Sequence, residues 1–115
     1  MVHASGGHPP AIAIAPDGTA TNLNSTGMMI GAFASAMHRD VRTTLTAGSK
    51  LYMFSDGCYE VFNAQEDMMS LEKFSTILAS SATHPEALDE AVAAARDWQD
   101  RHEFDDDFSL MEFHL

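Results

Sequence analysis

Apolar residues recur with the period of a β-strand near the start of the chain. Ile alternates with Ala over residues 11–15, as expected for a strand with two different faces. Turn residues bound this segment, with GGHPP at 6–10 and PDG at 16–18. We therefore predict a strand at 11–15, the end of another strand at 2–5 and a short strand at 19–23.

The middle of the chain predicts a β-hairpin. Residues 41–45 place Val, Thr and Leu on one face of a strand, and residues 51–54 form the continuous apolar run of a strand covered on both faces. The turn residues at 47–49 separate the two, so the simplest pairing is an antiparallel hairpin. The segment 26–36, rich in Gly, Met and Ala, is predicted to be a loop with short strand or helical turns.

Two amphipathic helices and a last strand follow. Ser70 is a good N-cap for a helix at 70–80, and Thr83-His84-Pro85-Glu86 has the pattern of a capping box for a second helix at 84–102. The apolar stripe of the first helix is Leu71, Phe74, Ile77 and Leu78. That of the second is Leu88, Ala91, Val92, Ala95 and Trp98. With a final strand at 108–113, the order predicts an α+β fold in which helices cover one face of an antiparallel sheet.

Composition and charge narrow the class of protein. The chain has 115 residues with 45% hydrophobic and 20% charged, which indicates one domain with a modest core. Its net charge of −11 argues against nucleic acid or an anionic membrane as a partner. Residues 1–50 carry 2 acidic and 3 basic side chains, whereas residues 51–115 carry 15 and 3. The acidic second part is either a solvated surface or, for a few residues, a site for cations.

The sequence also suggests a cellular environment. No apolar run approaches the roughly 20 residues of a membrane helix, and the start of the chain lacks the basic and apolar regions of a secretory signal. Cys58 is the only cysteine, which excludes an internal disulfide and a multi-cysteine zinc site. We expect no membrane insertion and a reducing, cytoplasmic location.

Two aspartates are the best candidates for chemistry. Asp56 follows the predicted strand at 51–54, and Asp106 precedes the one at 108–113. If these strands are antiparallel neighbours, both carboxylates lie at the same edge of the sheet, where carboxylates and water suit Mg²⁺ or Mn²⁺. Gly57 allows the backbone to approach closely beside Asp56. The alternative is an ordinary Asp-Gly turn and an ordinary charged loop.

Four segments in order resemble a known family. They are GGHPP at 6–10, Met29-Ile30-Gly31, SDGCYEVFN at 55–63 and DDFSL at 106–110. Together they resemble the second half of a PPM-type (protein phosphatase 2C-like) Ser/Thr phosphatase, of the bacterial branch named after the stage II sporulation phosphatase E. The corresponding family patterns are A-G-H-P-P, P-L-G, (T/S)-D-G-(V)-x-E-x-x-N and D-D-x-(T/S)-(L/V).

The resemblance implies a fold and a reaction. The family fold is an αββα sandwich of two antiparallel sheets flanked by helices, of which this chain would form part. In the family, two Mn²⁺ or Mg²⁺ ions activate a water that attacks a phosphoserine or phosphothreonine. The implied substrate is a signalling phosphoprotein such as the anti-sigma-factor antagonists of the bacterial stress response.

The resemblance also implies roles for single residues. Asp56 and Asp106 would be the catalytic metal ligands, and Gly57 would offer its backbone carbonyl. Asp107 would support these ligands from beside the site. Apart from the resemblance, Glu60 is expected to support the loop after Asp56 by hydrogen bonding, with a role in the site as the alternative. No residue is implied for binding the phosphoprotein.

The chain departs from the family in ways that affect the site. The upstream metal-binding segment D-x-x-G-H-G is absent, and the family's catalytic domain is longer than 115 residues. Residues 1–115 are therefore interpreted as the C-terminal portion of such a domain, with part of the metal ligands. Cys58 stands where a small aliphatic residue is usual, and Met68-Met69 replaces a glycine-aromatic pair.

The remaining notable residues are expected to be structural. His8 should fix a turn by hydrogen bonding to the backbone, and the other histidines should lie on the surface. Cys58 is expected to be a small buried hydrophobe and Trp98 an anchor of the second helix. The eight methionines fit core filler or a partner surface.

Three functions therefore stand side by side. The first is a metal-dependent phosphoprotein phosphatase domain. The second is a catalytically incomplete binding module that recognises a partner or dimerises through exposed sheet edges. The third is an acidic domain whose carboxylates only solvate it.

Overall fold

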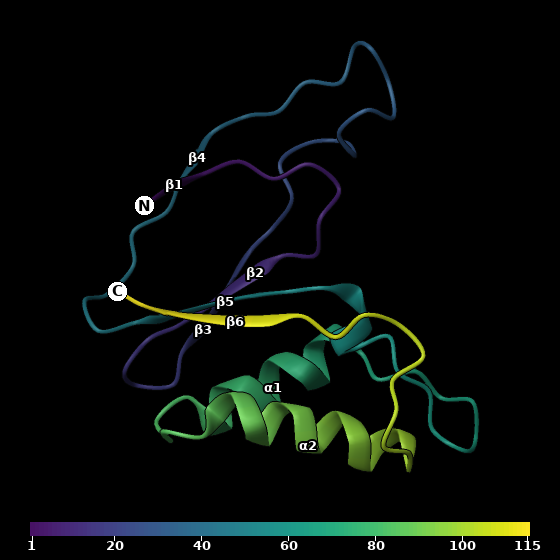
Figure 1. Cartoon of the computed structure of the whole chain (residues 1–115). Helices are drawn as coiled ribbons and strands as arrows, with labels where there is room; N and C mark the ends of the chain where they lie inside the picture. The colour runs from purple at the N-terminus through teal and green to yellow at the C-terminus, as the bar shows by residue number, and fades with distance from the viewer.

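Two helices lie across one face of a four-stranded antiparallel sheet, and a two-stranded sheet lies on its other side (Figure 1). This computed structural model describes residues 1–115. The strands are β1 (Val2–His3), β2 (Ala11–Ile14), β3 (Ala20–Leu23), β4 (Val41–Arg42), β5 (Lys50–Phe54) and β6 (Leu110–His114). The helices are the 3₁₀ turn η1 (Asp56–Cys58), α1 (Leu71–Ser81) and α2 (Ala87–Gln99). The larger sheet has the order β3-β2-β5-β6, and the smaller one pairs β1 with β4.

The register of the larger sheet aligns one set of apolar side chains across neighbouring strands, on the face that carries the helices. Ile12 lies opposite Tyr52, and Tyr52 lies opposite Glu112. Because side chains alternate between the two faces of a strand, Ile12 and Ile14 point the same way as Tyr52 and Phe54, into the core. The strand that the alternation of Ile and Ala predicted is present as β2, and Ala13 on its other face is buried too.

The hydrophobic core fills the space between this face and the helices. Phe74 of α1 is fully buried and meets Phe54 of β5 edge-to-face, with ring centroids 5.1 Å apart. Leu78 of α1 and Ala91 and Ala95 of α2 complete the contact from the helix side. The other members of the core cluster are Ile12, Ile14, Tyr52, Cys58, Val61, Met69 and Ala82.

The opposite face of the sheet is apolar and incompletely covered. Met111 and Phe113 of β6 are 50% and 44% exposed, and Leu51 and Met53 of β5 are half-buried. A cavity of about 450 Å³ separates this face from the N-terminal segment and from the loop around Ile30. On this side of the sheet, β1 and β4 are the only two strands that pair with each other.

The predicted hairpin of residues 41–45 with 51–54 is wrong. β4 covers only Val41–Arg42 and pairs with β1, whereas β5 pairs with β2 on one side and β6 on the other. Pairing of neighbouring segments is only a tendency. A central apolar strand gains more from two apolar neighbours than from the polar segment next to it in sequence.

The other strands follow the prediction with shifted ends. The strands expected at 2–5, 11–15 and 19–23 appear as β1, β2 and β3, and residues 26–36 carry no helix or strand longer than a single bridge. The last strand starts at Leu110 rather than 108, because Phe108 packs against the ring of Phe104 with centroids 4.5 Å apart.

The first helix is confirmed with its cap. α1 begins after Ser70, whose Oγ accepts the backbone N–H of Lys73 at 3.1 Å. This bond satisfies one of the free amides at the helix start.

The second helix differs from the prediction at both ends. The N–H of His84 donates to the carbonyl of Ser81 at 2.8 Å, so residues 83 and 84 close the turn after α1. α2 therefore starts at Ala87, and Glu86 is its N-cap without a side-chain bond; the predicted capping box is wrong. The helix ends at Gln99 because Asp100 takes a left-handed conformation with φ 53°. No helix of the fold combines the length and apolarity that spanning a membrane requires.

Trp98 anchors α2 from a half-buried position. Its ring packs against the core cluster, and its Nε1 donates to the carbonyl of Asp67 at 3.2 Å. The Lys73 ammonium lies 4.3 Å from the ring centroid. Of the methionines, Met69 is fully buried, whereas six are largely or half exposed: Met1, Met28, Met29, Met37, Met68 and Met111.

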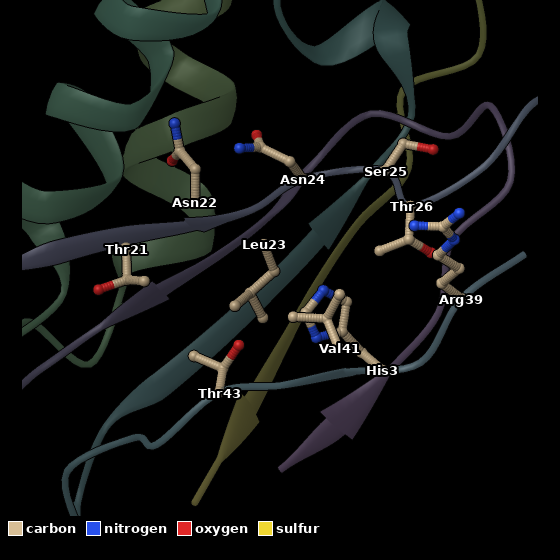
Figure 2. Close-up of a pocket in the computed structure, with 10 residues that line it drawn as sticks. All are labelled: His3, Thr21, Asn22, Leu23, Asn24, Ser25, Thr26, Arg39, Val41 and Thr43. Carbon is tan, nitrogen blue, oxygen red and sulfur yellow. The ribbon is translucent and has the colours of Figure 1, made fainter.

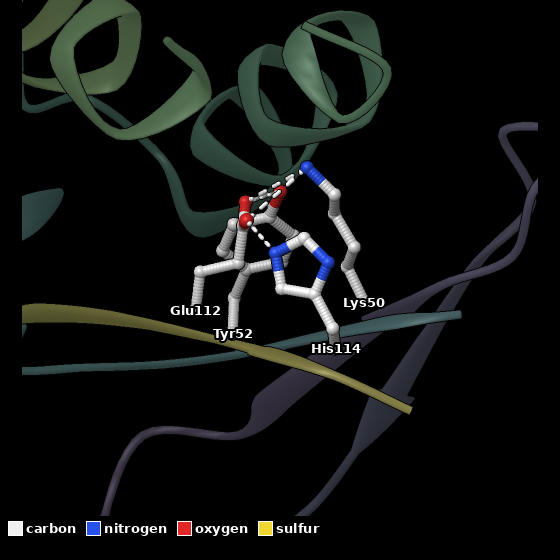
Figure 3. Close-up of polar contacts among 4 residues, drawn as sticks. All are labelled: Lys50, Tyr52, Glu112 and His114. Atoms are coloured by element: carbon white, nitrogen blue, oxygen red, sulfur yellow. Dashed lines mark hydrogen bonds and ion pairs between the residues drawn. The ribbon is translucent and has the colours of Figure 1, made fainter. Parts of the chain in front are cut away.

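A polar network interrupts the helix-facing side of the sheet at the far end from Asp56 (Figure 3). The Tyr52 hydroxyl donates to Glu112 Oε2 at 2.6 Å, and Lys50 Nζ lies 3.1 Å from Oε1 of the same carboxylate. His114 Nε2 lies 2.7 Å from Oε1. Burial raises the pKa of Glu112, but the hydrogen bonds from Tyr52, Lys50 and His114 outweigh it, so this pKa lies below its usual value of 4.5.

Candidate functional site

The antiparallel ladders bring three of the sequence motifs to one end of the sheet. β2 begins there just after the GGHPP segment, β5 ends there just before Asp56, and β6 begins there just after Asp106 and Asp107. Phe54 lies opposite Leu110, which fixes the register of the last two motifs. Asp56 and Asp106 were expected to lie at the same edge of the sheet if their strands were antiparallel neighbours, and β5 and β6 are.

The segment after β5 turns back sharply on itself. Asp56 starts the 3₁₀ turn η1, and its carbonyl accepts the N–H groups of Tyr59 at 3.0 Å and Glu60 at 2.8 Å. The Asp56 side chain is exposed, and its Oδ1 accepts the N–H of Gly57 at 3.1 Å. Oδ2 has no protein donor, so it faces solvent and any ligand there.

Gly57 packs directly against the segment before β6. A Cβ atom at this position would lie 2.5 Å from the carbonyl oxygen of Asp107 and 3.4 Å from the carbonyl carbon of Asp106. Only glycine allows so close an approach, because real Cβ contacts below 3.0 Å essentially do not occur. The backbones that carry Asp56 and Asp106 are therefore in contact.

The three consecutive aspartates before β6 have different surroundings. Asp105 forms an ion pair with Arg101 at 2.6 Å, and the hydrogen bond from this guanidinium lowers the pKa of Asp105. Asp106 is exposed, and its Oδ1 accepts the N–H of Asp107 at 2.8 Å. Asp107 contributes its backbone carbonyl to the contact with Gly57. Asp106 thus repeats the arrangement of Asp56, because Oδ1 of each accepts the N–H of the following residue and Oδ2 accepts no hydrogen bond from the protein.

The donor set fits part of a metal centre. Mg²⁺ and Mn²⁺ prefer carboxylate oxygens and water, and Mg²⁺ is commonly held through one or two carboxylates with several waters. Asp56 and Asp106 supply two exposed carboxylates of this kind. No group of three or more His, Cys, Asp or Glu side chains is arranged to hold a metal ion. Asp56 and Asp106 are therefore the residues of this end that could hold a divalent cation, and they do not make up a complete two-ion centre.

The neighbouring residues take structural positions. Glu60 joins the loop through its backbone N–H, and its side chain is exposed without a hydrogen bond. Cys58 is fully buried and its Sγ donates to the carbonyl of Ser109 at 3.2 Å. Burial raises the pKa of Cys58 to about 11, which keeps the thiol protonated at neutral pH. The prediction that Cys58 is a buried hydrophobe is confirmed.

The histidines follow the prediction with one exception. His8 is exposed and its Nδ1 lies 2.8 Å from the carbonyl of Pro9, a backbone contact within the turn. His38, His84, His102 and His114 are exposed. His3 is half-buried, and its buried Nδ1 has no hydrogen-bond partner.

Sequence reasoning did not find a polar pocket beside β3, shown in Figure 2. This cavity of about 380 Å³ lies between Thr21–Thr26 and the segment Arg39–Thr43, with His3 at its base. Leu23 points toward His3, whereas Asn22 and Asn24 point away. No aspartate or glutamate lines it, and no sequence motif pointed to it.

Comparisons with solved structures identify the class of fold. The chain superposes on the SiaA-PP2C domain of Pseudomonas aeruginosa with a TM-score of 0.78 and 21% identity, covering 94% of this chain and 44% of that one. It superposes on the RsbU and RsbW domains of Rv1364c from Mycobacterium tuberculosis with a TM-score of 0.69 and 21% identity, covering 96% and 31%. The fold is that of a PP2C-like phosphatase domain.

A family comparison then gives the particular family. The model of the stage II sporulation protein E (SpoIIE) family matches residues 1–115. The chain therefore belongs to the SpoIIE family, as the four sequence motifs indicated. A search of curated protein sequences found no significant match. The chain spans less than half the length of the solved structures it matches.

Proposed function

We propose that this chain is the C-terminal portion of a metal-dependent phosphoprotein phosphatase domain and carries part of its catalytic centre. Asp56 and Asp106 bind Mn²⁺ or Mg²⁺ through their free carboxylate oxygens, and the backbone of Gly57 lies beside the ion. The single observation that supports this most strongly is the contact between the Gly57 and Asp106–Asp107 backbones, which places the two carboxylate-bearing segments side by side.

The electrostatics of this end of the sheet support cation binding. Asp56, Glu60, Asp106 and Asp107 are exposed there, and Arg101 is engaged by Asp105. A cluster of carboxylates without a free basic partner raises the local concentration of cations. The same negative charge repels a phosphorylated substrate until cations neutralise it.

The proposed reaction is hydrolysis of phosphoserine or phosphothreonine in a signalling protein, such as an anti-sigma-factor antagonist. The chemistry that a divalent ion supplies at such a site is the activation of water toward a phosphoryl group. Asp56 and Asp106 orient the ion. The buried Cys58 thiol takes no part, because it is protonated and directed to the carbonyl of Ser109.

Mn²⁺ titration of the purified chain tests this function. We expect Asp56→Asn and Asp106→Asn each to weaken binding about tenfold or more, the usual scale for losing a group that orders a metal site. Free Mn²⁺ can be followed by electron paramagnetic resonance. Asp89→Asn is the matched control, because Asp89 is an exposed aspartate in the first turn of α2, at the opposite end of that helix from the aspartate loop.

The same variants test the reaction with a phosphopeptide. Manganese-dependent release of phosphate that is lost in Asp56→Asn and kept in Asp89→Asn supports the phosphatase proposal. Mn²⁺ binding that survives both site substitutions contradicts the proposed site.

A second candidate function is self-association, and the open face of the sheet favours it. Met111 and Phe113 of the edge strand β6 are 50% and 44% exposed. Exposed apolar surface next to an unpaired strand edge is typical of association sites. A second copy of this chain covering that face would leave the aspartates of the site accessible.

Sedimentation velocity tests self-association. We expect the wild-type chain to form a dimer at high concentration and Phe113→Lys to remain a monomer, because a charge on that face is costly to bury. Glu112→Lys is unsuitable as a control, since Glu112 is part of the polar network, so Glu72→Lys on the exposed side of α1 serves instead. A monomer at every concentration contradicts self-association.

A further inference from the structure

Ser55, which lies between β5 and the candidate ligand Asp56, bridges the two halves of the site through its hydroxyl. Its Oγ donates to the carbonyl of Asp107 at 2.6 Å and accepts the N–H of Ser109 at 3.0 Å. One side chain thus holds two peptide groups on either side of Phe108. Its own N–H donates to the carbonyl of Ser109 at 2.9 Å.

These bonds extend the contact between β5 and β6 past its last pair. The ladder ends where Phe54 lies opposite Leu110, and the backbone beyond it diverges into η1 and the aspartate loop. Without the hydroxyl, the Asp107 carbonyl and the Ser109 N–H lose the partner that joins them to Ser55. The main-chain bond from Ser55 to Ser109 does not depend on the side chain, so the hydroxyl is the only hydrogen bond from Ser55 that holds the Asp107 peptide.

We propose that Ser55 is a positioning residue that fixes the separation of the Asp56 and Asp106 carboxylates. The inference rests on the proposed metal-binding function of these two aspartates. Ser55 is covalently next to Asp56, and the carbonyl it holds belongs to the residue after Asp106. A shift of that peptide by a few tenths of an ångström moves one carboxylate relative to the other.

The close packing at Gly57 makes this control effective. A Cβ at Gly57 would lie 2.5 Å from the same Asp107 carbonyl that receives the Ser55 hydroxyl. The carbonyl is thus held by the hydroxyl on one side and packed against the Gly57 backbone. Two independent contacts act on one peptide group, and neither involves a carboxylate directly.

The test compares side chains of equal shape with and without a hydroxyl. Ser55→Thr keeps the hydroxyl and Ser55→Val removes it, and both suit the extended backbone of Ser55. We expect Ser55→Val to weaken Mn²⁺ binding about tenfold. Ser55→Thr, which keeps the hydroxyl, should keep the wild-type affinity. The readout is free Mn²⁺ by electron paramagnetic resonance, with the thermal midpoint of each variant measured alongside.

Ser49→Ala is the matched control at the other end of β5. Ser49 is buried and its Oγ donates to the carbonyl of Thr46 at 2.6 Å, away from both aspartates. We expect this variant to lose stability and to keep its Mn²⁺ affinity. A loss of affinity in Ser49→Ala equal to that in Ser55→Val overturns the proposal, because the effect would then be general loosening.

The outcomes separate this inference from the proposed function. Wild-type binding that depends on Asp56 and Asp106 but is unchanged in Ser55→Val overturns the positioning role alone. Absence of Mn²⁺ binding by the wild-type chain overturns the metal site, and the role of Ser55 with it. If Ser55→Val does not fold, Ser55→Ala replaces it, and failure of both to fold shows that the hydroxyl holds the fold rather than the site.

Discussion

Phe74→Ala is expected to lower the free energy of unfolding of this chain by about 3–5 kcal/mol. Phe74 is fully buried between α1 and the sheet and packs edge-to-face on Phe54. Truncating such a side chain costs about 3–5 kcal/mol through lost burial and the cavity left behind. Domains of this size have total stabilities of roughly 5–15 kcal/mol, so the loss is a large share of the total. Urea denaturation followed by far-UV circular dichroism measures the change.

Phe33→Ala is the control for this substitution. Phe33 has the same side chain but is 59% exposed in the loop between β3 and β4. Its truncation should change stability by no more than about 0.5 kcal/mol. Equal effects at the two positions would show that the helices do not pack on the sheet as described.

Glu112→Gln is expected to destabilise the chain at neutral pH and to have little effect in acid. The Glu112 side chain is only 12% exposed and accepts hydrogen bonds from Tyr52 and Lys50. A neutral amide is a weaker acceptor, and one of its atoms is a donor that faces other donors. We expect a loss of about 1–3 kcal/mol at pH 7, the cost of leaving buried polar groups badly paired.

The pH dependence follows from the direction of the pKa shift. The three hydrogen bonds outweigh burial and lower the pKa of Glu112 in the folded state below 4.5, its value when unfolded. The carboxylate therefore contributes its stability above pH 4.5 and loses it as the pH falls through the folded pKa. Urea midpoints of wild type and Glu112→Gln should differ most above pH 4.5 and converge as the pH falls through the lowered pKa of folded Glu112.

The partner of Glu112 gives the opposite dependence at high pH. Burial, then the hydrogen bond to Glu112 and its charge, raise the pKa of Tyr52 well above 10. Tyr52 therefore stays protonated and donating in the folded state, and its stability contribution falls once the pH exceeds 10.

The control for Glu112→Gln is Glu72→Gln, which changes an exposed carboxylate on α1. Its urea midpoint should not move relative to that of the wild type between pH 7 and pH 4. A constant gap for Glu112→Gln at every pH would contradict the network.

The sequence predicted those elements whose signals are local. The Ile and Ala alternation of β2, the Ser70 cap of α1 and the apolar run of β5 each act within a few residues, and each is present in the fold. The start of α2 was missed because the N–H of His84 donates to the carbonyl of Ser81. His84 therefore belongs to the turn after α1 and not to the helix. The hairpin was missed because strand pairing depends on segments far apart in sequence.

The motifs of the candidate site were visible in the sequence, and their geometry was not. Asp56, Gly57 and Asp106 could be named from the residue pattern, together with the expectation that the two aspartates share an edge of the sheet. The role of Ser55 left no signal, since its hydroxyl bonds reach residues 107 and 109. The pocket beside β3 also depends on three segments meeting in space.

Sequence alone thus determined the family, the helix and strand content and the identity of the acidic residues, because these follow from residue types and short-range periodicity. Tertiary structure decided that β5 lies between β2 and β6 and that Gly57 touches the Asp107 peptide. It also decided which one of three adjacent aspartates is drawn into an ion pair with Arg101. Such contacts arise only when the burial of the whole sheet fixes its register, and no window of neighbouring residues contains that information.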